Sequence, residues 1–281
     1  MALASEEVGD AIFRTASRMI WDGQGEGRSL AVLDAGTGRA SIAWLLRAPW
    51  VKSWTAITAS KSMEQDVAEE VKRAPAGTPP GTVVVSTWDR EDTCKGQTFD
   101  VIVADYLLGS VDGFTPYSQD LIFPRLTRHL RPGGLLVVVG LEPIPNAAPP
   151  PGDVVPMCAR LRDAVFLHAG QRPYREYPLS WVQRSLAQAG LTVEQIRHFP
   201  ILYSAQDLVK ELDTARSRLP VVEQRSGKAF ADALAAHIDD VEARTRARVA
   251  EQPGGKLKYG EDYLVTARAP AAAASGDSRC E

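Results

Sequence analysis

The sequence predicts an α/β fold built on a doubly wound, mostly parallel sheet. Short apolar segments rich in Val, Ile and Leu alternate with helical segments through the first half of the chain. Because these apolar segments show little polar alternation, we expect them to be buried on both faces, as parallel strands covered by helices are. In addition, the segment 30–40, LAVLDAGTGRA, runs as an apolar strand to Asp34 and then breaks into Gly36 and Gly38.

The elements of this first half follow in a regular order. A helix precedes the first strand, with Ile12, Ala16 and Met19 at helical spacing, and it packs on the sheet or forms part of a lid. The strands and helices that follow are expected at 29–34, 41–47, 53–58, 61–73, 83–89, 99–105 and 130–138. Right-handed crossovers place the loops after parallel strands on one sheet edge, so these loops are expected to form one site.

The glycine turn after the first strand is suited to holding a ligand against the main chain. A Cβ at Gly36 or Gly38 would block both the turn and the close approach of a nucleotide-like ligand. The free N–H groups of the following helix point at the same place. The alternative interpretation is that the glycines serve only the strand-to-helix turn of a doubly wound protein and bind no ligand.

Five segments in succession resemble the class I, Rossmann-like S-adenosylmethionine-dependent methyltransferases. DAGTGRA at 34–40 is similar to the family's D/E-x-G-x-G-x-G, with Ala40 in place of the third glycine. The segments 54–60, 83–89 and 99–105 resemble its second, third and fourth strands. LRPGGLLVV at 130–138 is similar to its L-x-P-G-G turn and is the most specific match. Together they cover roughly residues 28–142.

The resemblance implies a seven-stranded sheet with an antiparallel edge strand, and S-adenosyl-L-methionine as the cofactor. The positions that it assigns to cofactor binding are Asp34, Gly36, Thr37, Gly38, Thr58, Ala59, Trp88, Asp89, Arg90 and Asp105. Thr58 departs from the family, which has an acidic residue there to bind the ribose hydroxyls. A hydroxyl lacks the charge that strengthens such bonds.

The second half of the chain adds parts to the core of residues 1–142. Residues 143–203 are expected to form a Pro-rich connection, helices on the substrate side and a sixth strand, and residues 259–268 the last strand. The insert at 204–258 has two amphipathic helical stripes and is a cap or a dimerisation element. The tail at 269–281 has little to bury and is expected to be disordered.

The expected reaction is in-line methyl transfer to a small molecule. Tyr106 follows the fourth strand, where the resemblance places the reacting centre. His168 is a second candidate, because the unperturbed pKa of a histidine side chain suits a base near neutral pH, and its alternative role is structural. The candidate substrate residues are Tyr117, Arg172, Tyr174 and Arg175. The local arginine excess suggests an anionic acceptor or, alternatively, a solvated helix face.

The composition limits which partners, metals and cellular location are expected. A net charge of −3 gives no reason to expect nucleic acid, and the three cysteines lack metal-ligand spacing, so no metal is expected. No apolar run reaches the length of a membrane span, and the N-terminal residues lack a signal pattern, so a cytoplasmic protein is expected. A non-catalytic cofactor-binding protein and a protein methyltransferase remain alternatives. The missing ribose acid argues against a nicotinamide dehydrogenase.

Overall fold

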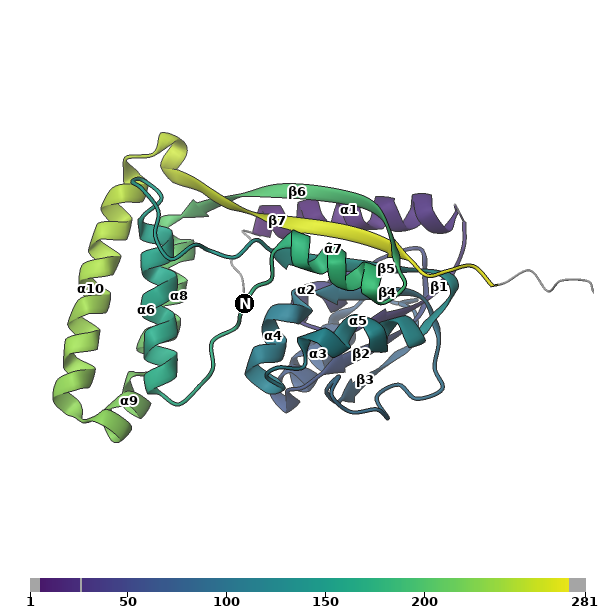
Figure 1. The fold of residues 1–281 in the computed structure, drawn as a ribbon, viewed down its shortest axis with the longest axis horizontal. Helices are drawn as coiled ribbons and strands as arrows, with labels where there is room; N and C mark the ends of the chain where they lie inside the picture. The colour runs from purple at the N-terminus through teal and green to yellow at the C-terminus, as the bar shows by residue number, and fades with distance from the viewer. Residues whose placement is uncertain (1–5, 26, 273–281) are drawn as a thin grey trace, which may run out of the picture.

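The computed structural model describes residues 6–25 and 27–272, which form a seven-stranded sheet with helices on both faces (Figure 1). The strand order is β3-β2-β1-β4-β5-β7-β6, with β7 antiparallel to both of its neighbours and the other pairs parallel. The strands are β1 (Leu30–Asp34), β2 (Val51–Thr58), β3 (Gly81–Val85), β4 (Phe99–Asp105), β5 (Leu130–Leu141), β6 (Thr192–Ser204) and β7 (Lys256–Arg268). The predicted mostly parallel, doubly wound sheet with an antiparallel strand is confirmed.

Each face of the sheet is covered by a layer of helices. One layer consists of α1 (Glu6–Gln24), α2 (Arg39–Leu45) and α3 (Lys61–Arg73). The other consists of α4 (Leu107–Phe114), α5 (Gln119–Arg128) and α7 (Leu179–Gln188). Ile12 and Met19 of α1 are buried in the same cluster as Val32 of β1, so this helix packs on the sheet, the first of its two expected roles.

The third strand is shorter than predicted. It ends at Val85, after which the Ser86 N–H donates to the Thr58 carbonyl oxygen at 2.9 Å and the chain turns. Trp88 and Asp89, predicted as strand residues, therefore lie in the connection that follows the strand. This places both residues beyond the end of β3, at the edge where a ligand of a parallel sheet binds.

A second unit, the helical cap, stands at the far ends of β6 and β7 (Figure 1). It consists of α6 (Val154–His168), α8 (Ala205–Arg216), α9 (Leu219–Ser226) and α10 (Lys228–Ala250). The insert forms three helices and not two, because Gly227 breaks the second stripe with a φ of +90°. Helix α6 precedes β6 in the chain, yet its Cys158 and Leu161 share one apolar core with Leu212 and Ile238 of the insert.

The last described residues stay attached to the sheet. The Ala269 N–H donates to the Gly134 carbonyl oxygen at 2.9 Å, and the Gly133 N–H donates to that of Pro270 at 3.1 Å. The part of the predicted disordered tail from residue 273 onward lies outside the described residues. None of the described helices combines the length and the apolar character needed to cross a membrane.

Candidate active site

The glycine turn links β1 to α2 and is fixed by both neighbouring strands. The Ala35 N–H donates to the carbonyl oxygen of Val103 in β4, and the Thr37 N–H donates to that of Ile57 in β2, each at 2.8 Å. The two glycines of this turn have different roles. A Cβ on Gly36 would lie 2.7 Å from Cδ1 of Leu107, so any other residue here would force the Leu107 side chain of α4 to shift.

Gly38 faces open space. Its backbone is extended, with φ −131° and ψ 178°, a conformation that any residue can adopt. A Cβ built on Gly38 meets no described atom within 4 Å. Neither strain nor packing within the described protein therefore demands glycine here, and the open side of the turn is free to receive a ligand.

Asp34, at the end of β1, is a buried carboxylate with one free oxygen. The Ser41 hydroxyl of α2 donates to Oδ2 at 2.7 Å, whereas Oδ1 has no hydrogen-bond partner among the described residues. Burial raises the pKa of Asp34 to about 6, against the lowering effect of the Ser41 and Thr37 hydroxyls and the Gly36 N–H. The Thr37 hydroxyl lies near this carboxylate but makes no well-formed hydrogen bond within the described chain.

Asp105 and Tyr106 end β4 beside this turn. Tyr106 has a left-handed backbone with φ +46°, and its N–H donates to the Val139 carbonyl oxygen of β5 at 3.1 Å. Asp105 Oδ1 and the Tyr106 hydroxyl are buried, and neither has a well-formed hydrogen bond in the described part of the chain. Burial, and then the charges of Asp34 and Asp262, raise the pKa of Asp105 to about 7.

Asp262 of β7 joins this group, and sequence reasoning missed it. It is fully buried opposite Leu141 of β5, and its carboxylate faces the Tyr106 hydroxyl, although neither of its oxygens makes a well-formed hydrogen bond to a described residue. Burial raises the pKa of Asp262 to about 7. We call Asp34, Asp105 and Asp262 the acidic cluster.

The residues predicted to bind the ribose and adenine follow β2 and β3. Thr58 is buried, and its hydroxyl oxygen accepts from the Ser60 N–H at 3.2 Å, beside Ala59. The buried Trp88 indole donates to the Ala35 carbonyl oxygen. Asp89 and Arg90 are exposed. The predicted cofactor residues therefore follow one sheet edge, along the turns after β1, β2, β3 and β4.

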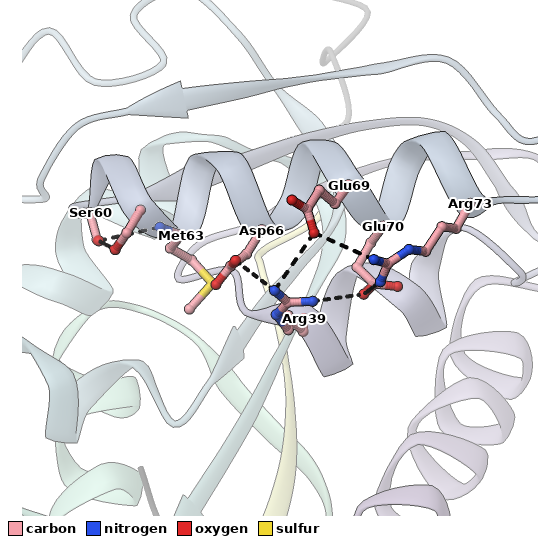
Figure 2. A network of polar contacts seen from close by, with 8 residues as sticks. Arg39, Ser60, Met63, Asp66, Glu69, Glu70 and Arg73 are labelled. Carbon is pink, nitrogen blue, oxygen red and sulfur yellow. Dashed lines mark hydrogen bonds and ion pairs between the residues drawn. The ribbon is translucent and has the colours of Figure 1, made fainter.

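Arg39 links two helices of the same layer, α2 and α3, next to this edge. It directly follows Gly38, and its guanidinium reaches the acidic side chains of α3 (Figure 2). The guanidinium nitrogens of Arg39 lie 2.6 Å from a carboxylate oxygen of Asp66, 3.3 Å from one of Glu70 and 3.9 Å from one of Glu69. Exposed pairs of this kind contribute at most about 1 kcal/mol each. Their effect is to hold the start of α2, and with it the glycine turn, against α3.

Comparison with solved structures identifies the fold. A putative methyltransferase from Bacillus halodurans has a TM-score of 0.58 at 15% identity, covering 92% of this chain and 100% of that one. The mycolic acid cyclopropane synthase CmaA1, complexed with SAH, has a TM-score of 0.54 at 15% identity over 95% and 89% of the two chains. Coclaurine N-methyltransferase, bound to N-methylheliamine and SAH, has 0.51 at 14% identity over 95% and 74%. The chain has the class I methyltransferase fold.

No protein-family model and no curated protein matches the sequence. The fold is therefore established by the solved structures and by the strand order, whereas the activity has to be argued from the site. In a methyltransferase fold, the site is expected at the carboxyl edge of the sheet.

A cavity of about 170 Å³ lies between the core of this fold and the helical cap. The walls are formed by the segment that follows β5, by α6 and α8, and by the segment before α7, which contributes Tyr174, Arg175 and Glu176. A second cavity, of about 240 Å³, is lined by Trp88 and by several basic side chains of the β3–β4 connection and α5. The lining of neither cavity contains a member of the acidic cluster.

The remaining predicted residues are divided between the cavity and other surfaces. Tyr174 and Arg175 line the cavity, and Arg175 pairs with Asp163 at 3.3 Å. Arg172 instead lies over the exposed Tyr117 ring, 4.9 Å from its centroid. His168 is exposed at the end of α6 and contacts the Phe230 ring of α10 at 4.7 Å. These contacts do not bring His168, Tyr117 or Arg172 to the acidic cluster.

Proposed function

We propose that the protein binds S-adenosyl-L-methionine and transfers its methyl group to a small-molecule acceptor. The observation that carries this proposal is the row of buried polar atoms beside the glycine turn that make no well-formed hydrogen bond within the described chain. These atoms are Asp34 Oδ1, Thr37 Oγ1, Asp105 Oδ1 and the Tyr106 hydroxyl oxygen. Leaving a buried polar group unpaired costs about 1–3 kcal/mol, so a polar ligand is expected to complete the site.

The residues of the edge fit this cofactor. Asp34 and Asp105 would hold the ammonium group of the cofactor. The open space beside Gly38 would receive the rest of the cofactor's methionine part. Thr58 would contact the ribose, and Asp89 with Trp88 would flank the adenine. When bound, the cofactor supplies an activated sulfonium methyl. The protein then has to align the acceptor, exclude water and take up a proton where one is released.

Two of the similar structures support this choice of cofactor, since CmaA1 and coclaurine N-methyltransferase were each solved with SAH. The cavity supports a small acceptor over a protein substrate, because it is a confined space between two units of one chain. Coclaurine N-methyltransferase, bound to N-methylheliamine, is a small-molecule enzyme of the same fold.

The position of the cavity also supports a cap role for the insert. Leu208 and Glu211 of α8 form part of its wall, together with Tyr174 and Glu176 of the segment before α7. A unit that served dimerisation alone would not need to contribute side chains to this space. We therefore assign the helical cap the task of excluding water from the acceptor.

The test has two stages. Isothermal calorimetry should detect binding of S-adenosylhomocysteine but not of NAD, and absence of binding would refute the proposal. A metabolite extract incubated with the protein and a radiolabelled methyl donor should then yield labelled small molecules. Binding without any transfer would instead favour the non-catalytic alternative.

A further inference from the structure

The cavity lining carries three arginines, Arg160, Arg162 and Arg175, and three carboxylates, Asp163, Glu176 and Glu211, so their pairing decides which charges remain on the wall. Arg162 contacts both Asp163 and Glu211, and Arg175 contacts Asp163, so these two cations already have carboxylate partners. Arg160 is exposed, and its guanidinium donates to the Asn146 carbonyl oxygen at 3.1 Å. The arginine excess that suggested an anionic acceptor is therefore largely neutralised within the protein.

Glu176 is the carboxylate of the cavity lining that is not paired with one of these arginines. No hydrogen bond or ion pair joins it to another residue of the described chain, and the charge of Arg162 acts on it only from a distance. The Glu176 side chain is held against the backbone of α4, where a Cβ on Gly109 would lie 2.6 Å from its Oε1. Helix α4 follows Tyr106 directly, so this contact places Glu176 at the side of the cavity next to the reacting centre.

Among the described residues, Glu176 lies near one carboxylate, Asp262, and one guanidinium, Arg162. Asp262 is close enough for its charge to contribute to the raised pKa of Glu176, which burial chiefly brings to about 7. Asp105 and Asp262 have no ion pair with any cation of the described residues. An anionic acceptor would meet repulsion from these carboxylates, whereas a cationic one would supply the missing countercharge.

We propose, on the basis of the proposed function, that the acceptor is an amine, which Glu176 binds directly at the inner wall of the cavity. The amine enters as an ammonium ion, and one N–H proton passes to the Glu176 carboxylate and on to solvent. The free nitrogen lone pair then forms the new N–C bond as the C–S bond of the sulfonium donor breaks, and the bonding electrons remain on sulfur. The products are the N-methylated ammonium and the neutral thioether.

The test uses the full chain, a radiolabelled methyl donor and a metabolite extract divided into two portions. One portion is first treated with acetic anhydride under conditions that acylate primary and secondary amines. We expect the initial rate of label incorporation to fall at least about tenfold in the acylated portion. Labelling that survives acylation would overturn the amine inference while leaving methyl transfer established.

Variants provide a second, independent measurement on the untreated extract. Glu176→Gln should lower the labelling rate about tenfold and leave the affinity for S-adenosylhomocysteine within about threefold, because the lost contact is with the acceptor. Glu261→Gln is the matched control, since Glu261 is an exposed carboxylate of β7 that pairs with His198 outside the cavity. A full rate in Glu176→Gln would overturn the role of Glu176. Absence of label with wild-type protein would instead refute the proposed methyl transfer, and this inference with it.

Discussion

The indole nitrogen of Trp88 donates a hydrogen bond to the carbonyl oxygen of Ala35, at a distance of 2.5 Å. Ala35 belongs to the glycine turn after β1, and Trp88 to the connection after β3, so the bond joins two loops of the carboxyl edge. The carbonyl oxygen of Trp88 in turn accepts from Arg125 of α5. The glycine turn is thus held by the Trp88 side chain, and the Trp88 backbone is in turn bonded to α5.

We predict that Trp88→Phe weakens binding of S-adenosylhomocysteine by about threefold to tenfold. The substitution removes a buried hydrogen bond worth about 0.5–1.5 kcal/mol and leaves the Ala35 carbonyl unpaired, so the turn loses its preorganised shape. Calorimetry measures the affinity. Trp44→Phe is the matched control, because the Trp44 indole donates to Ser17 on the opposite face of the sheet. An equal loss in both variants would contradict a specific role for Trp88.

Substitutions at the two glycines of the turn should have different effects, one on ligand binding and the other on folding stability. Gly38→Val adds a side chain to open space, so we expect a folded protein with nearly unchanged thermal stability and no detectable binding of S-adenosylhomocysteine. Gly36→Ala places a Cβ 2.7 Å from Leu107 and should lower the stability by about 1–3 kcal/mol through overpacking. Thermal unfolding and calorimetry are measured on both. Undiminished binding by Gly38→Val would refute a ligand on this side of the turn.

The succession of strands and helices along the first half of the chain could be predicted from the sequence, because the signals are local. The apolar run before Asp34 and the glycines after it each reflect the preferences of a few neighbouring residues. Right-handed crossovers then bring separate turns together whatever the details of packing, which explains why the predicted cofactor positions line one edge.

The missed features depend on contacts between distant segments. Asp262 lies in an antiparallel strand, to which the rule about the carboxyl ends of parallel strands does not apply. Its signal in the sequence is an acidic residue next to Glu261, directly before the apolar run 263–267. Similarly, the apolar face of α6 looks like a core helix in sequence, and only the folded chain places Cys158 and Leu161 against the insert.

A charged residue at position 58 should strengthen cofactor binding. The Thr58 hydroxyl oxygen already accepts from the Ser60 N–H, and the carboxylate of Thr58→Asp could keep that bond while accepting from a ribose hydroxyl. A gain of about 1 kcal/mol, roughly fivefold in affinity, is expected in calorimetry with S-adenosylhomocysteine. Thr58→Asn, which is neutral and of similar size, should gain little. Weaker binding by Thr58→Asp would mean that position 58 does not face the ribose.

The acidic cluster should make folding stability depend on pH. The pKa of Asp262 rises from 3.8 to about 7 in the folded protein, so the folded state binds the proton more tightly than the unfolded state. Below pH 4 Asp262 is protonated in both the folded and the unfolded state, so its ionisation does not lower the free energy of unfolding. As the pH rises from 4 to 7 the unfolded state gains by ionising, so stability is lost across this window and stays constant above it.

Asp262→Asn should remove this loss. We expect it to raise the thermal unfolding temperature at pH 8 by about 5 °C, which corresponds to roughly 2 kcal/mol for a chain of this size, and to change it little at pH 4.5. Differential scanning calorimetry at both pH values measures the effect without ligand. Glu261→Gln, one residue away on the same strand but exposed, should show no such pH-dependent gain. An equal effect of Asp262→Asn at both pH values would mean that Asp262 does not titrate in this window, because only a group that ionises between pH 4.5 and 8 makes the difference between the two measurements.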